Sequence, residues 1–446
     1  MLEPAHHADV VIVGAGVAGL SAAHQLTSAG VTTVVLEAAP YVGGRMSTEK
    51  VDGFRLDRIG QLLTTSYPEL RRTPGLDALV LRPFVPGVLV HSDGRHHRAV
   101  EPTSARRARG ALTAARALAS APRVPRAART APRPAPLGGA LDQARLGAAL
   151  ARLAATPPER LLTRPELPAA EALFTRGLPS RTVNGFLRPL LSALLCDPDL
   201  TTSSRCADLA LRSFARGRLC LPEGGAEVLP ELLAGALPPG TVRTGVRVTG
   251  VSTTSVTTAD HGELGCSAVL LATDARAAAG LLPGLRVPSF HPVTVLHHAA
   301  PEPPLAEPAL LLDADRSGPV AHTAVISHVD PSRAPAGRAL ISSTVLGPPP
   351  DERAVLTHLA ELYGTSTARW ESLAVHHTRE AVPAMPPPHD LRRPVRLLSG
   401  LYVCGDHRDT STVQGALYSG RRAARAALAD FGVKPADGTG RLPMAA

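Results

Sequence analysis

Three glycines and one carboxylate near the start of the chain have a spacing that suits the binding of a dinucleotide. Gly14, Gly16 and Gly19 form a G-x-G-x-x-G pattern, and Glu37 follows 21 residues after Gly16. The first glycine permits a tight turn, the second lets the backbone approach a pyrophosphate, and the third lets a helix pack closely on a strand. A glutamate in this position accepts hydrogen bonds from a ribose and repels a 2′-phosphate. The pattern therefore favours FAD or NAD.

The elements around this turn follow from the hydrophobic pattern. Residues 10–13 are a short β-branched run typical of a buried parallel strand, residues 20–28 predict a helix, and residues 34–36 predict a second strand. The N-terminus of that helix offers free N–H donors and a partial positive charge to phosphates. We expect the cofactor to contact the turn and the start of the segment after the second strand, namely Gly14, Ala15, Gly16, Val17, Ala18, Gly19, Glu37 and Ala38.

The segment after Glu37 resembles that of a known superfamily. Residues 37–45 read E-x-x-x-x-x-G-G-R and end in Gly43, Gly44 and Arg45. This resembles the flavin amine oxidase, protoporphyrinogen oxidase and phytoene desaturase superfamily. The resemblance implies FAD as the cofactor, with Arg45 near its phosphates. The residues suit that role, because two glycines make an open turn and a guanidinium can clamp a diphosphate.

Three further segments carry the same resemblance. Residues 56–61 are similar to a D-x-G-x-Q/H stretch that lies against the isoalloxazine, although Ile59 alters its spacing; this implies contacts from Gly60 and Gln61. Residues 246–248 follow a glycine pair at 224–225 and resemble the strand whose backbone meets adenine, which implies Val248. Residues 400–424 resemble the final FAD motif. This implies that Gly405 and Asp406 contact the ribityl or pyrophosphate region, and that the amides of Val413, Gln414 and Gly415 face the flavin O2 edge.

These segments predict an α/β fold. A Rossmann-type FAD-binding domain, a parallel sheet with helices, should be interleaved with a mixed α+β substrate domain that carries a helical insertion rich in Ala, Arg and Pro. Within the first domain we expect a helix over 227–236, strands over 242–250, 252–258 and 268–272, and a last helix over 413–431. The predicted division is 1–95, 219–284 and 396–432 for the FAD-binding domain, 96–218 and 285–395 for the substrate domain, and 433–446 for a flexible tail.

The chain also departs from the amine-oxidising members of the superfamily. Many of them use a lysine that holds a water near flavin N5, whereas Lys50 and Lys434 are the only lysines here. Aromatic residues are 3% of the chain, so an aromatic cage beside the flavin is poorly supplied. Residues 376–399 contain no cysteine, so FAD should be held non-covalently. These departures favour the desaturase side of the superfamily, with Gln61 and Asp409 as candidate catalytic groups near the flavin.

The expected function is that of an FAD-dependent oxidoreductase that moves a hydride from a small or medium-sized organic substrate to flavin N5. Desaturation and C–N oxidation both remain open, and oxygen or a quinone is the expected electron acceptor because only one dinucleotide fingerprint is visible. A flavin-dependent isomerase of a polyene or cyclic substrate is one alternative. A flavin-binding partner protein without catalysis is the other, and the sequence favours no particular oligomeric state.

Composition limits the partners. The 446 residues carry a formal charge of +9, nearly all of it from arginine, and eight arginines fall within residues 106–133. This window suggests either a solvated helix face or peripheral contact with a membrane, and the scarcity of aromatic residues argues against nucleic acid. Five cysteines without C-x-x-C spacing and adjacent histidine pairs, which point to opposite faces of a strand, predict no metal site. The N-terminus lacks a secretory pattern, so we expect a cytoplasmic protein.

Overall fold

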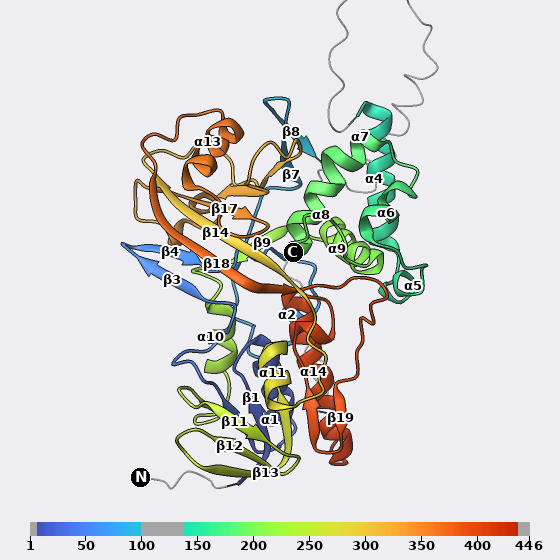
Figure 1. Cartoon of the computed structure of the whole chain (residues 1–446), viewed down its shortest axis with the longest axis vertical. Helices are drawn as coiled ribbons and strands as arrows, with labels where there is room; N and C mark the ends of the chain where they lie inside the picture. Colours follow the sequence, from blue (N-terminus) through green and yellow to red (C-terminus); the bar gives the residue numbers. More distant parts are fainter. Residues whose placement is uncertain (1–6, 100–137, 436–446) are drawn as a thin grey trace, which may run out of the picture.

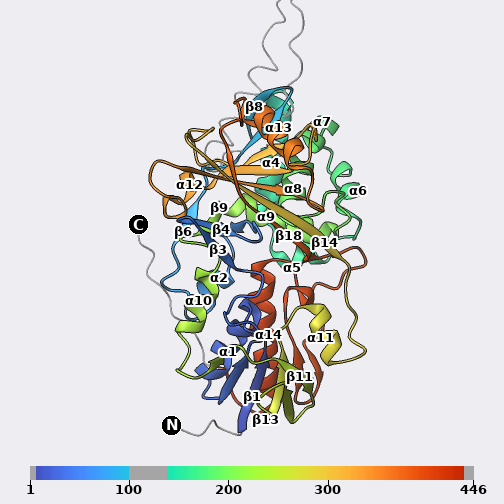
Figure 2. The same ribbon diagram turned by 60° about the vertical axis from the view of Figure 1, so that its left-hand side comes forward.

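The computed structural model describes residues 7–99 and 138–435. These residues form two bodies stacked along the long axis of the molecule (Figure 1). The lower body contains both the first and the last strands of the described chain, so segments far apart in sequence lie side by side. The upper body contains a second sheet with a group of helices beside it (Figure 2). The predicted α/β fold with a Rossmann-type, mainly parallel sheet is confirmed.

The lower body is built on an eight-stranded sheet with the order β10-β2-β1-β13-β12-β11, and β20 and β19 continue it from β13. Strands β10, β2, β1, β13 and β20 run parallel. Residues Val10 to Val13 of β1 are a continuous apolar run and all are buried, as is typical of a parallel strand that is covered on both faces. The strands are β1 His7–Val13, β2 Thr33–Leu36, β10 Val242–Arg243, β11 Val248–Val251, β12 Ser255–Thr258, β13 Glu263–Leu271, β19 Arg396–Leu398 and β20 Leu401–Val403.

Two helices of this body pack unusually closely. Helices α1 and α14 meet through glycines: a Cβ added to Gly420 would lie 2.1 Å from the carbonyl oxygen of Ala18. The Ser21 hydroxyl also donates to the carbonyl of Leu417 at 3.0 Å. This contact brings the two chain ends to one edge of the sheet. The helices of the lower body are α1 Val17–Ser28, α2 Glu69–Arg72, α10 Val228–Gly235, α11 Ala275–Leu281 and α14 Val413–Asp430, with a 3₁₀ turn η3 over Asp406–Arg408.

The upper body is built on a seven-stranded sheet with the order β18-β14-β17-β16-β15-β7-β8. Its longest pairing joins β14 and β18 in antiparallel register. Two small sheets, β3 with β4 and β5-β9-β6, lie where the chain passes between the bodies. The strands are β7 Val88–Ser92, β8 Arg95–Ala99, β14 Phe290–Ala300, β15 Leu311–Asp313, β16 His322–Val325, β17 Ala339–Val345, β18 Glu371–Pro383, β3 Thr48–Val51, β4 Phe54–Asp57, β5 Leu63–Thr64, β6 Leu81–Pro83 and β9 Leu219–Pro222.

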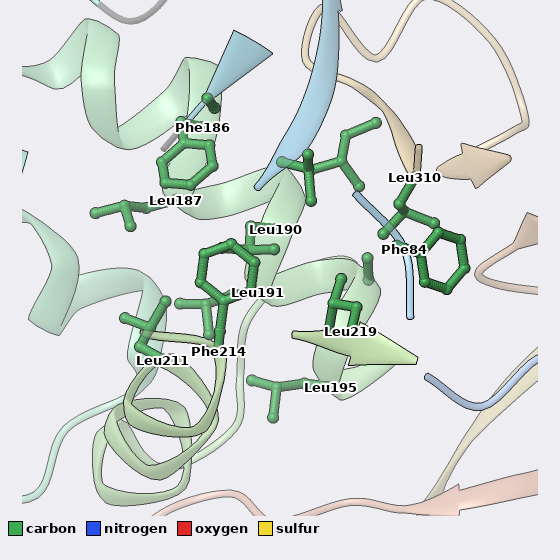
Figure 3. Packing of buried hydrophobic residues seen from close by; sticks show 14 of the residues in the cluster. Phe84, Phe186, Leu187, Leu190, Leu191, Leu195, Leu211, Phe214, Leu219 and Leu310 are labelled. Carbon is green, nitrogen blue, oxygen red and sulfur yellow. The ribbon is translucent and has the colours of Figure 1, made fainter. Parts of the chain in front are cut away.

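A large apolar core joins the helices of the upper body to its sheet. Phe186, Leu190, Leu191 and Phe214 lie buried between α8 and α9, next to Leu219 of β9 (Figure 3). The helical elements are α4 Ala140–Ala155, α5 Pro158–Leu162, α6 Ala169–Phe174, α7 Ser180–Thr182, a π-helical turn η1 Val183–Leu187, α8 Arg188–Leu195, α9 Ser204–Arg216, α12 Ile326–Val329, a 3₁₀ turn η2 Pro331–Arg333 and α13 Glu352–Tyr363.

Several predicted boundaries differ from the structure. The strand expected over 242–250 is two strands, because Gly245 has a positive φ of 73° and turns the chain between β10 and β11. The hairpin β7–β8 belongs to the seven-stranded sheet, where Leu89 pairs with Leu311, so the boundary predicted at residue 95 falls inside that hairpin. The arginine-rich window 106–133 and residues 436–446 of the predicted tail lie outside the described residues.

Candidate functional site

A cavity of about 650 Å³ opens at the carboxyl ends of β1, β2 and β13, between the N-termini of α1 and α14. This edge of a parallel sheet is where nucleotides bind in doubly wound folds. Most of the residues predicted to contact the cofactor line the cavity. They are Gly14, Gly16, Val17, Ala18, Glu37, Ala38, Gly43, Gly44, Arg45, Gln61, Val248, Gly405, Asp406 and Val413.

The glycine turn places backbone, without side chains, against this cavity. Gly14 has a positive φ of 106°, and a Cβ there would lie 2.9 Å from the carbonyl oxygen of Ala272. A Cβ on Gly19 would lie 2.1 Å from the carbonyl oxygen of Gly14, so Gly19 serves the packing of α1 and does not line the cavity. A Cβ on Gly16 would meet no atom within 4 Å, which leaves its backbone open to a ligand.

The Glu37 carboxylate is held in place by two backbone donors. Its Oε2 accepts the N–H of Ala15 at 2.8 Å, and its Oε1 accepts the N–H of Ala39 at 2.9 Å. Ala15 itself does not line the cavity, because it is buried beneath the turn. Each carboxylate oxygen keeps a further lone pair, so Glu37 can still accept hydrogen bonds from a ribose.

Arg45 connects the segment after β2 with the segment before α14. Its Nη2 donates to Oδ1 of Asp406 at 2.6 Å, and its Nη1 donates to the carbonyl of Ala381 at 2.7 Å. Burial alone would lower the pKa of Arg45, but the charges of Asp406 and Asp274 and the hydrogen bond to Asp406 raise it overall. The guanidinium therefore stays charged at the wall of the cavity.

The start of α14 differs in part from the prediction. Val413 lines the cavity, whereas the Gly415 N–H donates to the hydroxyl of Thr412, the N-cap, at 3.1 Å. A Cβ on Gly415 would lie 1.9 Å from the carbonyl oxygen of Thr410, so this glycine serves the tight entry into the helix. Gln414 faces away from the cavity and accepts the N–H of Glu69 at 2.9 Å through its side chain.

Gly60 also lies outside the cavity. A Cβ built on Gly60 would lie 3.4 Å from the Thr344 hydroxyl, so Gly60 packs against the seven-stranded sheet while its neighbour Gln61 lines the cavity.

The segment after β13 also lines the cavity, although no sequence motif pointed to it. Thr273, Asp274 and α11 line the cavity there, and Asp274 caps α11 by accepting two N–H groups. An aspartate directly after a buried strand was the signal that could have found it.

A second cavity of about 250 Å³ adjoins the first. Thr412 lines both, and the neighbouring residues Gln61 and Leu62 line the first and the second cavity respectively. Tyr67 and Phe214 also line the second cavity. Leucines form its apolar wall, with Leu62, Leu63, Leu162, Leu194, Leu195, Leu209 and Leu219 among them, and the lining also contains seven charged residues, Glu69, Arg72, Glu159, Arg212, Arg392, Asp409 and Arg421. The leucine wall suits an apolar ligand.

Asp409 lines the second cavity, not the first. The structure places it in the adjoining cavity, and its predicted place near the flavin stays a prediction. Burial raises the pKa of Asp409 to about 6, although the N–H of Thr410 and the charge of Arg422 act in the opposite direction. Its Oδ2 lies 3.4 Å from Nη1 of Arg422. A carboxyl group with this pKa can accept a proton near neutral pH.

The histidine pairs take separate surroundings, as their alternation on strands predicts. The His297 ring packs edge-on against His376 at 5.6 Å, whereas the adjacent His298 faces Trp370. Burial lowers the pKa of His297 to about 4. Within residues 7–99 and 138–435, no group of three His, Cys, Asp or Glu side chains could hold a metal ion. In the same ranges, no helix combines the length and apolar character that crossing a bilayer requires.

Known proteins share both local sequence and the whole fold with this chain. Putrescine oxidase of Kocuria rosea is 50% identical over 68 residues, 15% of this chain and 14% of that protein. Carotenoid 3,4-desaturase of Haloarcula japonica is 51% identical over 49 residues, 11% of this chain and 10% of that protein. The structure of a putative protoporphyrinogen oxidase from Exiguobacterium has a TM-score of 0.67 at 19% identity over 95% of this chain and 99% of that one, which shows a shared fold.

The cavity fits FAD on its own evidence. Its volume, the open backbone at Gly16, the anchored Glu37 carboxylate and the charged Arg45 are what an extended dinucleotide with a diphosphate requires. Residues 17–428 match the family described as flavin containing amine oxidoreductase, which is most of the chain. The protein therefore belongs to the flavin-containing amine oxidoreductase family and is an FAD-dependent oxidoreductase.

Proposed function

We propose that the protein desaturates a largely apolar organic substrate that lies in the second cavity. The observation that carries the proposal is the leucine-rich part of the lining of this cavity, next to the wall that Thr412 shares with the cofactor cavity. Among the residues that line either cavity there is no lysine. Lys50 is exposed and pairs with Glu227 at 3.1 Å, and Lys434 is exposed as well.

The charges near the second cavity favour a neutral centre over an ammonium group. Glu69, the most buried carboxylate in its lining, is already neutralised by two hydrogen bonds from Arg421. Asp409 lies beside Arg422, and the charges of Arg422 and Arg392 both act to lower its pKa. These guanidinium groups would repel a protonated amine, so removal of hydrogen from a C–C unit suits the site better than C–N oxidation.

The roles of the residues follow from their positions. Gly16, Glu37 and Arg45 would hold FAD, which when bound supplies the acceptor for a hydride. The leucines of the second cavity exclude water and orient the apolar substrate, so that one C–H bond points toward the cofactor cavity. Asp409 would accept the proton that leaves the neighbouring carbon, because its pKa of about 6 leaves it mostly ionised at pH 7.

The test is reduction of the bound flavin without oxygen. The purified protein should be yellow, and a panel of unsaturated and saturated cyclic hydrocarbons, polyenes and primary amines should be mixed with it anaerobically. Bleaching of the flavin by hydrocarbon members and not by amines supports the proposal. Bleaching by amines alone contradicts it and favours C–N oxidation. Steady turnover of a polyene by the reduced enzyme, without an acceptor, would favour isomerisation instead.

The role of Asp409 has its own variant. Asp409→Asn should slow anaerobic flavin reduction by roughly 10²- to 10⁴-fold, the usual contribution of a general base. Glu159→Gln is the matched control, because Glu159 is an exposed carboxylate that lines the same cavity. If both variants reduce the flavin at similar rates, Asp409 is not the proton acceptor.

A further inference from the structure

A third cavity, of about 470 Å³, continues the second one toward solvent. It lies between α5, the segment around Glu166 and residues 388–392. Residues 388–392 belong to the link from β18 to β19, which passes near α5 (Figure 1). The two cavities share Leu162, Leu391 and Arg392 in their linings. A ligand longer than the second cavity would therefore extend into the third.

The wall of the third cavity contains a buried histidine. His389 is 6% exposed; its ring has no side-chain hydrogen-bond partner among the described residues, and the backbone of Asp409 is the acceptor next to it. The ring lies beside the backbone of Asp409, so it stands between the third cavity and the proposed proton acceptor. A ligand that accepts a hydrogen bond would compete with that backbone for the ring N–H.

The cationic groups of this cavity are better available than its anionic groups. Glu166 is already engaged: it accepts the hydroxyl of Ser203 and the N–H of His389, and it pairs with Arg205 at 3.5 Å. Arg392, by contrast, is an exposed residue whose guanidinium forms no salt bridge and donates no hydrogen bond to any described residue. The remaining acid of the lining, Asp390, is exposed and accepts the backbone N–H of Arg392 at 2.9 Å.

Charges outside the lining reinforce this polarity. Burial lowers the pKa of His389 to about 4 and the charge of Arg393 adds to this, whereas Glu166, the backbone of Asp409 and Asp390 oppose it. His389 is thus neutral at pH 7 and keeps one ring N–H to donate. Burial and the like charge of Arg286 in turn lower the pKa of Arg393, with Asp390 opposing, so cationic groups crowd this side of the cavity.

We propose that the third cavity binds the carboxylate of an amphipathic substrate, through Arg392 and the ring of His389, while the apolar body of that substrate fills the second cavity. This inference rests on the proposed function, because it assigns the second cavity to the substrate. It narrows the substrate class to elongated organic acids. Arg392 then sets the direction in which the substrate lies, with its apolar end toward the cofactor.

The test measures binding and needs no turnover. The FAD-loaded enzyme is titrated by calorimetry with octanoate, octan-1-ol and octylamine, which share one chain and differ in the head group. Octanoate should bind about 10-fold or more tightly than octylamine, as a charge-assisted hydrogen bond to a guanidinium implies. Tighter binding of octylamine, or equal binding of all three, overturns the proposal.

A variant and a salt series separate this outcome from unfolding. Arg392→Gln should weaken octanoate binding about 10-fold, whereas Arg160→Gln, which changes an exposed arginine of α5 outside both linings, should not. Flavin absorbance confirms that each variant is folded and loaded. In the unaltered enzyme, raising the ionic strength from about 0.05 to about 0.5 M should weaken the binding of octanoate and leave the binding of octan-1-ol unchanged. If Arg392→Gln matches its control, or salt leaves octanoate unaffected, the carboxylate site is absent, although anaerobic bleaching could still support desaturation.

Discussion

A buried ion network ties the two bodies together at the glycine pair 224–225, and its loss should destabilise the enzyme strongly. Arg333 is 1% exposed. Its Nη1 lies 2.5 Å from Oδ2 of Asp57, its Nε lies 3.0 Å from Oδ2 of Asp330, and its Nη2 donates to the carbonyl of Pro222 at 2.8 Å. The same two carboxylates accept the N–H groups of Ala226 and Gly224. One guanidinium thus compensates two buried charges.

Replacing Arg333 by Met keeps a side chain of similar length but removes the charge. Removing one partner of a buried ion pair typically lowers the free energy of unfolding by about 3–5 kcal/mol. Because Arg333→Met leaves both Asp57 and Asp330 without a cation, we expect a value in that range and not below it. Urea unfolding of the FAD-loaded enzyme, followed by far-ultraviolet circular dichroism, measures the change. Arg338→Gln is the control, because its exposed pair with Glu371 should be worth less than about 1 kcal/mol.

The acid dependence of stability gives a second readout. Burial raises the pKa of Asp330, but the Gly224 N–H, the Ser332 hydroxyl and Arg333 outweigh it, so the pKa is lowered overall. A carboxyl with a lowered pKa stabilises the fold above its unfolded pKa of about 4 and ceases to do so as the pH falls further. Arg333→Met should weaken this dependence, and Asp57→Asn with Asp330→Asn in the same chain should restore part of the stability. If Arg333→Met lowers the free energy of unfolding by no more than Arg338→Gln does, the reasoning is refuted.

Three further predictions concern the site and the thiols. The rate of anaerobic flavin reduction should rise as the pH increases through about 6 and then level off, because Asp409 must be ionised to accept a proton; a profile flat from pH 5 to 8 would contradict this. Gly420→Ala should lower the melting temperature, because its Cβ would collide with Ala18. Gly16→Ala should fold normally but bind FAD more weakly. Equal FAD affinity in Gly16→Ala and the unaltered protein would show that the turn does not approach the cofactor. The four buried cysteines, Cys206, Cys220, Cys266 and Cys404, should resist a thiol reagent at pH 8 until the protein unfolds, because burial raises the pKa of each. Rapid labelling of more than one thiol in the folded protein would contradict their buried positions.

The parts of the site that the sequence predicted are those where local backbone demands and local function coincide. Gly14 and Gly16 occupy a turn whose positive φ and open space follow from the G-x-G-x-x-G spacing alone. Glu37 could be placed because the second strand ends directly before it, and strand ends share one edge of a parallel sheet. Such residues need no knowledge of distant contacts.

The parts that could not be predicted depend on contacts across the chain. Gly60 packs on Thr344 of β17, so only the position of the upper sheet decides that Gln61, and not Gly60, lines the cavity. Asp409 stands three residues from Asp406, yet the 3₁₀ turn η3 between them separates their cavities. The hairpin β7–β8 follows the FAD-binding segments in sequence, but its pairing with β15, more than 200 residues away, assigns it to the upper sheet.

The pairing of Arg45 with Asp406 bears on which groups attract a diphosphate. The guanidinium already donates to a carboxylate and to the carbonyl of Ala381, so much of its charge is balanced before any ligand arrives. The N-terminus of α1 is different, because its first N–H groups have no partner within the helix and face the cavity from Val17 and Ala18. We therefore infer that backbone donors supply most of the attraction, while Arg45, which stays charged, adds to it and also sets the position of the C-terminal segment against the turn. This division explains why three glycines, and not a cluster of basic side chains, mark the site in the sequence.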